Sequence, residues 1–222
     1  MKKILISVIL SITILFCSIP AASFAIEANH ASTTDMNAQD VVYETIKAVN
    51  DHNLTSFINL QCEANKADYE TFFRGLDWNK DNDGLMCIET ASISEIKELP
   101  LAEVTGFTSI DKYENIYDDL SAFYAGINYT VQEESKYYFN GVNYRIIITG
   151  KENGQWKIVE ISDAPVESLY GTDYSFNSHT EKVALEIISE RFQGNIINSK
   201  GALLSKNVNV LSDSEHVKPN YI

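Results

Sequence analysis

The N-terminal part of the chain has a helical pattern. Over residues 37–51 apolar residues recur about one turn apart, with polar residues between them, which predicts an amphipathic helix with one buried side. Asn53 is placed to cap a short second helix over 54–60, and a third helical stretch is expected over 66–74. The apolar side of that third stretch consists of Tyr69, Phe72 and Phe73.

After a loop over 75–84 the period of the pattern changes to two. Short alternations cover 86–101 and 118–132, which favours strands with one buried face. Asn140-Gly141 and Asn153-Gly154 each stand between runs rich in Tyr, Ile, Val and Trp, and Asn-Gly favours the positive φ of a tight hairpin turn. Three consecutive antiparallel strands are predicted, over 127–139, 142–151 and 155–162.

A last helix is predicted near the C-terminus. Ser178 with Glu181 three residues later matches a capping box, and Gly194 marks the end of the helix. The apolar positions between them are Ala184, Ile187, Ile188 and Phe192. One short strand pair and a polar tail are expected after the helix. Helices followed by an antiparallel meander predict an α+β domain, with N-terminal helices packed in a curved sheet and an additional C-terminal helix.

The first residues predict export. Lys2 and Lys3 precede an apolar run and small residues that end at Ala25, which is the pattern of a signal peptide over 1–25. Lipidation at Cys17 is the alternative, but Phe16 stands where a small residue is needed. The expected product is soluble and secreted, either extracellular or at the cell envelope. The remaining divisions are a linker over 26–36, the α+β domain over 37–165, and a C-terminal helix and tail over 166–222.

The charge of the chain restricts its partners. The formal net charge is -14, and loss of Lys2 and Lys3 with the signal makes it -16. Such a surface repels nucleic acid and anionic lipid or wall polymer. The expected partners are therefore a cell-wall component or an envelope protein, with no nucleic acid and no membrane after signal cleavage. An open sheet face often pairs with a second copy, so a homodimer through the sheet is also considered.

Two features suggest stabilising chemistry. Asn79, Asp81 and Asp83 occupy oxygen-donor places of a calcium loop with Gly84 in its sixth place, although the twelfth place holds Thr90 instead of a bidentate Glu. The alternative is a solvated turn, and no cofactor other than Ca²⁺ is indicated. Cys62 and Cys87 could form a disulfide in an oxidising compartment, or remain as two buried thiols.

Tyrosines provide the candidate ligand-binding residues. A carbonyl-directed proton-transfer site would need a Tyr beside an acid of raised pKa. The candidates are Tyr113, Tyr117, Tyr124, Tyr129 and Tyr144 with Asp118 and Asp119, although so many tyrosines in a β-rich chain are also ordinary core residues. In the string Tyr137-Tyr138-Phe139 at least one ring must face outward if it is a strand, so Tyr137 and Tyr138 are candidates for glycan or peptide binding.

The element order and the closing strand NGQWKIVEIS resemble the nuclear transport factor 2-like, or cystatin-like, cone fold. The strings KYYFNGVNYRIIITGKENGQWKIVEISDAP and TEKVALEIISERFQGNIINSKG are similar to the N-terminal accessory region of secreted Gram-positive cell-wall proteins. In those proteins the region precedes an amidase domain or a domain like stage II sporulation protein D. The resemblance covers about residues 37–205.

The resemblance implies a role in the cell envelope without catalysis by this region. The chain ends at Ile222, which leaves no room for the downstream catalytic domain. We therefore expect a secreted, non-catalytic binding or assembly module. The two alternatives are a small-molecule pocket protein, such as an isomerase-like enzyme of the cone fold, and a calcium-stabilised structural module.

Overall fold

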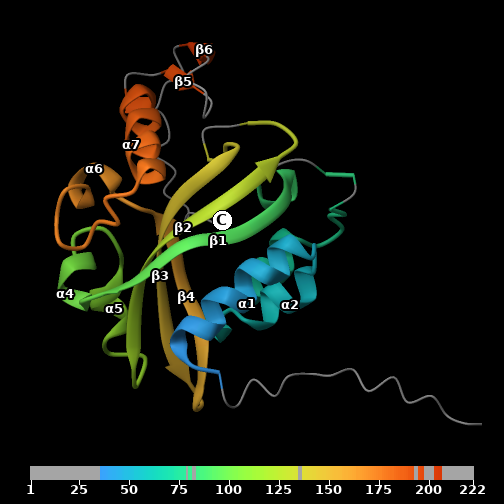
Figure 1. Ribbon diagram of the computed structural model, residues 1–222. Helices are drawn as coiled ribbons and strands as arrows, with labels where there is room; N and C mark the ends of the chain where they lie inside the picture. The colour runs from blue at the N-terminus through green and yellow to red at the C-terminus, as the bar shows by residue number, and fades with distance from the viewer. Residues whose placement is uncertain are drawn as a thin grey trace, which may run out of the picture. The chain divides into compact units, whose positions relative to one another are not determined.

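A computed structural model describes residues 36–78, 80–81, 84–134, 137–192, 195–197 and 203–206. The predicted signal peptide, nearly all of the predicted linker and the polar tail lie outside this part of the chain. Its centre is a four-stranded antiparallel sheet in the order β1-β2-β3-β4 (Figure 1). The strands are β1 (Ile88–Leu99), β2 (Leu120–Val131), β3 (Gly141–Glu152) and β4 (Gln155–Asp163). The predicted α+β class is thus confirmed.

Three helices pack on one face of the sheet, and side chains cap the first two of them. They are α1 (Ala38–Asn50), α2 (Leu54–Asn59) and α3 (Glu63–Phe72). Asn37 and Asp40 form a capping box at the start of α1. The Asn53 side chain accepts a hydrogen bond from Ser56 N, so its predicted capping role is confirmed.

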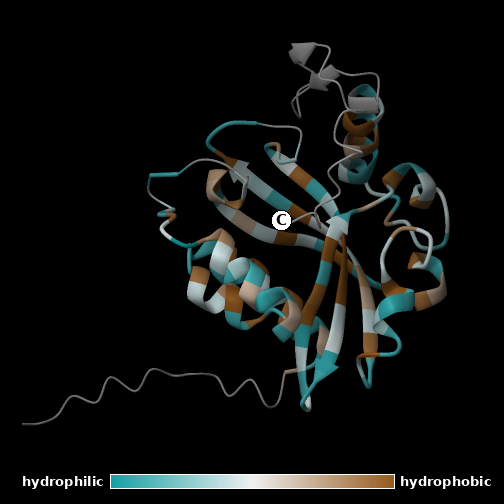
Figure 2. Cartoon of the chain, turned by 180° about the vertical axis from the view of Figure 1, so that it is seen from behind, coloured by the Kyte–Doolittle hydropathy of each residue, from teal (hydrophilic) through white to brown (hydrophobic). Residues whose placement is uncertain are grey.

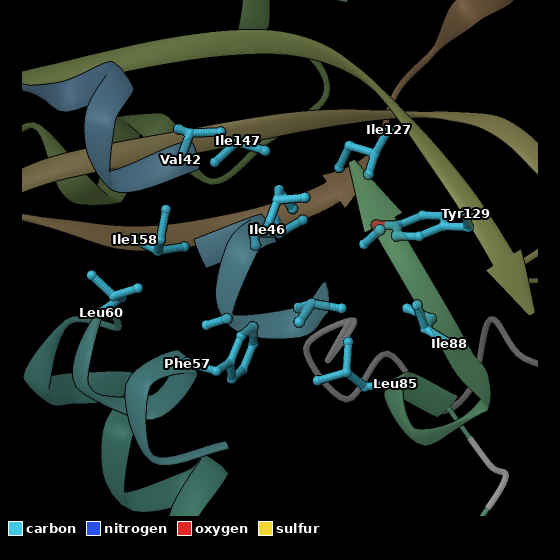
Figure 3. Close-up of a cluster of buried hydrophobic side chains, with 14 of the residues drawn as sticks. Val42, Ile46, Phe57, Leu60, Leu85, Ile88, Ile127, Tyr129, Ile147 and Ile158 are labelled. Atoms are coloured by element: carbon cyan, nitrogen blue, oxygen red, sulfur yellow. The ribbon is translucent and has the colours of Figure 1, made fainter. Parts of the chain in front are cut away.

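The first core lies between these helices and the sheet. Val42 and Ile46 of α1 point toward Ile127 and Ile147 of the sheet, and Phe57 closes the lower side (Figure 3). Burial of each such side chain contributes roughly 1.5–3 kcal/mol. The amphipathic pattern over 37–51 therefore predicts the buried side of α1 correctly.

The opposite face of the sheet is covered as well. The covering helices are α4 (Leu101–Val104), α5 (Ile110–Tyr113), α6 (Val166–Leu169) and α7 (His179–Phe192). They form a second core with alternate residues of the same strands, such as Ile146 and Ile148. The predicted C-terminal helix thus belongs to the same domain as the sheet, and a homodimer would have to use a surface other than the buried sheet centre.

Strand β3 contributes side chains to the cores on both faces of the sheet. Figure 2 shows hydrophobic residues along the strands and hydrophilic residues at the hairpin tips. In β3 the interior run from Asn143 to Gly150 is buried on both faces. Alternation is therefore weak in β3, and its assignment as a strand depends on residue type and on the turns that bound it.

The two Asn-Gly pairs behave differently. Asn153 and Gly154 have φ values of 52° and 79°, and Glu152 pairs with Gln155, so the predicted tight turn between β3 and β4 is confirmed. The predicted strand over 127–139 is wrong beyond Val131, because β2 ends there and β3 begins at Gly141.

The side chain of Asn140 explains why its turn differs. Its Oδ1 accepts a hydrogen bond from Val131 N at 2.9 Å, and its Nδ2 donates to the Glu134 carboxylate at 2.9 Å. The amide therefore joins the two ends of a longer connection, described over 132–134 and 137–140, instead of a two-residue turn. After α7, the predicted short strand pair is present as β5 (Asn195–Ile197) and β6 (Leu203–Lys206).

Of the two alternatives considered for the cysteines, the structure has the two buried thiols. Cys62 and Cys87 are both buried, and no disulfide joins them. Cys87 belongs to the first core and Cys62 to the second. The two thiols are thus held apart by the same sheet that separates the two cores.

The burial of both thiols predicts their reactivity. The chain without residues 1–25 contains two cysteines, because Cys17 is removed from the three in the sequence. We expect neither thiol to react with an aromatic disulfide reagent in the native protein, and both to react in denaturant, where the cores are open. If neither thiol reacts in denaturant without a reducing agent, the two cysteines form a disulfide instead.

Candidate functional site

The structure divides the candidate tyrosines between the two faces of the sheet. Tyr124 and Tyr144 lie on the second face, with ring centroids 5.3 Å apart. Tyr129 and Tyr138 lie in the first core, with ring centroids 5.5 Å apart in an edge-to-face arrangement. Asp118 is exposed just before β2 and lies outside both groups. The acid that meets a tyrosine must therefore come from elsewhere in the chain.

That acid is Glu181 of α7, whose side chain is buried with the residue at 0% exposure. Tyr124 Oη donates a hydrogen bond to Glu181 Oε1 at 2.8 Å. The other carboxylate oxygen accepts from Ser175 Oγ at 2.6 Å and from Asn177 N at 2.8 Å. Both oxygens of the buried carboxylate thus have donors from the chain itself, as a buried acid requires.

The local sequence explains how Glu181 reaches this place. Ser178 Oγ accepts a hydrogen bond from Glu181 N at 3.1 Å, so the predicted capping contact of Ser178 is confirmed. The Glu181 carboxylate does not return to the backbone of Ser178, as a full capping box would require, and turns to Tyr124, Ser175 and Asn177 instead. The second half of the predicted capping box is therefore wrong.

A second carboxylate meets the other tyrosine at the same helix end. Tyr144 Oη donates a hydrogen bond to Glu95 Oε1 on β1. Ser178 Oγ donates to the same oxygen at 2.8 Å, and Thr180 Oγ1 lies 3.4 Å from it. Two acids thus lie at the N-terminus of α7, where the helix dipole favours negative charge.

Gly126 makes the contact between Glu95 and Tyr144 possible. Glu95, Gly126 and Tyr144 are paired residues on three neighbouring strands, so they form one row across the sheet. A Cβ on Gly126 would lie 2.9 Å from Tyr144 Cε1 and 3.0 Å from Glu95 Cγ. The missing side chain lets the Tyr144 ring lie across β2 and reach the edge strand.

Both tyrosines are held in their protonated form. Burial raises the pKa of Tyr124 far above its ordinary value, and the hydrogen bond to Glu181 raises it further. Burial, followed by the hydrogen bond to Glu95, likewise raises the pKa of Tyr144. The two hydroxyls therefore remain protonated hydrogen-bond donors throughout the physiological pH range.

An aromatic and cationic cover closes the cluster. The Phe176 ring stacks on Tyr124 at 4.9 Å, and Lys97 Nζ lies 5.5 Å from the Phe176 centroid. Lys97 also donates to Ser175 O at 2.7 Å. Residues 175–177, which precede α7, thus contact both Lys97 of β1 and the Glu181 carboxylate.

The arrangement of the second face attaches α7 to the sheet. Proton transfer to a substrate would need a hydroxyl or carboxylate oxygen directed at a ligand. Here the hydroxyls of Tyr124 and Tyr144 are directed at Glu181 and Glu95, and both Glu181 oxygens already accept from the chain. We define Glu95, Tyr124, Tyr144 and Glu181 as the tyrosine–glutamate cluster.

The first-face tyrosines anchor the connection over 132–140. The buried Arg145 forms an ion pair with Asp163 and donates to Tyr137 O at 2.8 Å. Its guanidinium lies 5.5 Å from the centroid of the Tyr138 ring. Burial raises the pKa of Tyr138 and of Tyr129, and the charge of Arg145 opposes part of this rise. Tyr138 is therefore a core anchor of the connection.

Tyr137 differs from its neighbours, because 50% of its surface is exposed while Tyr138 and Phe139 are buried. Its backbone is fixed on one side by Arg145, and Asn143 fixes Phe139 through hydrogen bonds in both directions. Tyr137 is thus the exposed ring of the string, but residues 137–139 are not in a strand, so the strand alternation on which the expectation rests does not apply. The connection presents this ring from a backbone that is tied to β3.

The remaining candidate tyrosines form a separate group near β4. Burial, with the neighbouring Glu160, raises the pKa of Tyr113 to about 12. Burial also raises the pKa of Tyr117, whose ring lies over Gly150 and whose hydroxyl faces Cys62. Asp119 instead pairs with Lys151, away from these hydroxyls. This group packs α5 onto the sheet.

Part of the predicted calcium loop is described. Asp81 accepts a hydrogen bond from Asp77 N at 2.7 Å, and Lys80 pairs with the Asp77 carboxylate. Asn79 and Asp83 lie outside the described residues. Within the described ranges, no group of three or more His, Cys, Asp or Glu side chains is arranged to hold a metal ion. The described contacts are those of a local polar turn.

Comparison with known proteins gives no relative. No family model, no curated protein and no solved structure matches the chain. The resemblance to cone-fold domains and to cell-wall proteins therefore stays a prediction. In the described part of the chain, no helix is both long enough and apolar enough to cross a membrane.

The sequence did not identify Glu95 or Arg145 as partners of the tyrosines, and it placed Glu181 in a capping box instead of beside Tyr124. A signal for Glu181 existed, because it stands three residues before Ala184 and so lies on the buried side of the predicted helix. Arg145 lies two residues before Ile147, on the face of β3 that points into the first core. Neither position reveals its partner from spacing alone.

The role of Gly126 can be tested by Gly126→Ala. The added methyl group should displace the Tyr144 ring from Glu95 and lower the unfolding free energy by about 1–3 kcal/mol, the usual cost of overpacking. Chemical denaturation measures this change.

Gly106→Ala is the matched control, because a Cβ there meets no heavy atom within 4 Å and Gly106 has no positive φ. Adding Tyr144→Phe to Gly126→Ala should cost less than the sum of the two single changes. Full additivity would show that Gly126 does not act through Tyr144.

Proposed function

We propose that this protein is a secreted, non-catalytic binding or assembly module of the bacterial cell envelope. The observation that supports a non-catalytic role is the closed hydrogen bonding of the tyrosine–glutamate cluster. Its hydroxyls donate to acids of the chain, and the Glu181 carboxylate is enclosed by three donors. An isomerase-like site would instead direct such groups at a ligand.

The envelope location rests on the N-terminal residues and on charge. Lys2 and Lys3, followed by an apolar run and by small residues up to Ala25, are typical of an export signal. The net charge of -14 disfavours binding to anionic wall polymers, so the partner is better sought in neutral glycan, peptide or protein.

We assign recognition to the connection over 132–140, with Tyr137 as its contact residue. A half-exposed aromatic ring offers a flat apolar surface to a sugar ring or a peptide side chain. Because Arg145 and Tyr138 hold the surrounding backbone, the ring loses little additional freedom on binding. An anchored aromatic residue of this kind suits a binding surface.

We also infer that the finer fold is of the cone type. Support comes from α1, which packs along one face of a long antiparallel meander. Register shifts at Ile93/Glu95 and Ile148/Thr149 provide the bulges by which a sheet bends around a helix. The additional helices on the second face are compatible with an extended member of that class.

The proposed recognition can be tested by co-sedimentation of residues 26–222 with purified Gram-positive cell walls, before and after removal of anionic polymers. Binding should survive moderate salt and the removal of these polymers. Tyr137→Ala should weaken it roughly fivefold or more, as expected for loss of an aromatic contact worth at least about 1 kcal/mol.

The matched control is Tyr43→Ala, because Tyr43 is a similarly exposed tyrosine, at 44%, on the outer side of α1. Tyr138→Ala is unsuitable, because Tyr138 is a buried part of the core. Absence of binding to both wall preparations would contradict wall recognition, and equal losses for Tyr137→Ala and Tyr43→Ala would contradict the assignment to Tyr137.

A further inference from the structure

The two Asn-Gly pairs differ in how their side-chain amides are held. Asn140 is fixed by Val131 N on its Oδ1 and by the Glu134 carboxylate on its Nδ2. Asn153 and Gly154 are both exposed at the tip of the β3–β4 hairpin, and no hydrogen bond holds the Asn153 amide within the described part of the chain. The same dipeptide thus occurs once in a locked and once in an open setting.

We propose that Asn153 is a site of spontaneous deamidation, and that Asn140 is protected from the same reaction. In the first step the backbone nitrogen of Gly154 attacks Cγ of Asn153 and loses its proton to water. The bond from Cγ to the side-chain nitrogen breaks, ammonia leaves, and a succinimide ring remains. Water then opens the ring at one of its two carbonyls, which gives aspartate or isoaspartate.

The hairpin tip meets the steric needs of this reaction. Gly154 has no side chain to hinder the attack, and a Cβ built on it meets no heavy atom within 4 Å. The attack requires rotation of the Asn153 backbone out of its left-handed conformation, where φ is 52°. Asn tolerates this conformation better than most residues other than glycine, so the rotation costs the opening of an exposed two-residue turn.

At Asn140 the same reaction has to break the hydrogen bonds to Val131 and Glu134 first. Its Oδ1 closes the connection over 132–140, so the side chain cannot turn toward Gly141 without opening that connection. The loss of two such hydrogen bonds makes the reaction at Asn140 roughly tenfold or more slower than at Asn153.

The product changes the hairpin that positions β4. Aspartate adds a negative charge next to Glu152, and isoaspartate adds a carbon atom to the main chain of a two-residue turn. Because such a turn sets the register of its strands, the isoaspartate form should loosen the pairing of Glu152 with Gln155. The deamidated fraction of Asn153 would then increase with the time since synthesis, independently of what the protein binds.

Incubation of the purified protein at mildly alkaline pH, followed by peptide mass mapping, tests the proposal. We expect the peptide with Asn153 to gain the mass difference between an amide and a carboxylic acid, at least roughly tenfold faster than the peptide with Asn140. Asn153→Gln should abolish this gain, because the longer side chain forms a cyclic imide far more slowly.

The protein in denaturant is the reference, because both amides are free there and should convert at similar rates. Equal or faster conversion of Asn140 in the native protein would overturn the proposal. Absence of conversion at Asn153 over a period in which the denatured protein converts would overturn it as well.

Discussion

The buried carboxylate of Glu181 is the contact on which the second half of the structure depends. An acid without exposed surface is costly unless its oxygens accept hydrogen bonds, and Tyr124, Ser175 and Asn177 provide them. These donors fix the residues before α7 and bring the helix onto the sheet. Because α7 then helps to cover the second face, that face of the sheet is part of a buried core and not an open surface.

Much of the fold follows from local sequence, and the exception is instructive. Helical spacing predicts α1, and Asn53 caps α2 as expected. Asn153-Gly154 forms the expected tight turn, whereas Asn140-Gly141 does not, although the dipeptide is the same. The difference arises from Val131 and Glu134, which bind the Asn140 side chain and which no local rule identifies as its partners.

The site could be predicted only in part, for a related reason. Tyr124 and Tyr144 were identifiable as candidates, but the acids that meet them are Glu181 and Glu95 instead of Asp118. Glu95 meets Tyr144 only because β1, β2 and β3 share one register, with Gly126 between the two side chains. Register and the docking of α7 are tertiary properties, so residue spacing does not contain them.

The most direct test of a structural role for the tyrosine–glutamate cluster is a double-mutant cycle of Tyr124→Phe and Glu181→Gln on the free energy of unfolding. The account predicts that Tyr124→Phe destabilises the protein and that the two changes are coupled by about 1–3 kcal/mol, as expected for a buried hydrogen bond to a charged group. Additive changes would contradict this account. A Tyr124→Phe protein that is more stable than the unchanged protein would also contradict it, because such a gain is typical of strained functional sites.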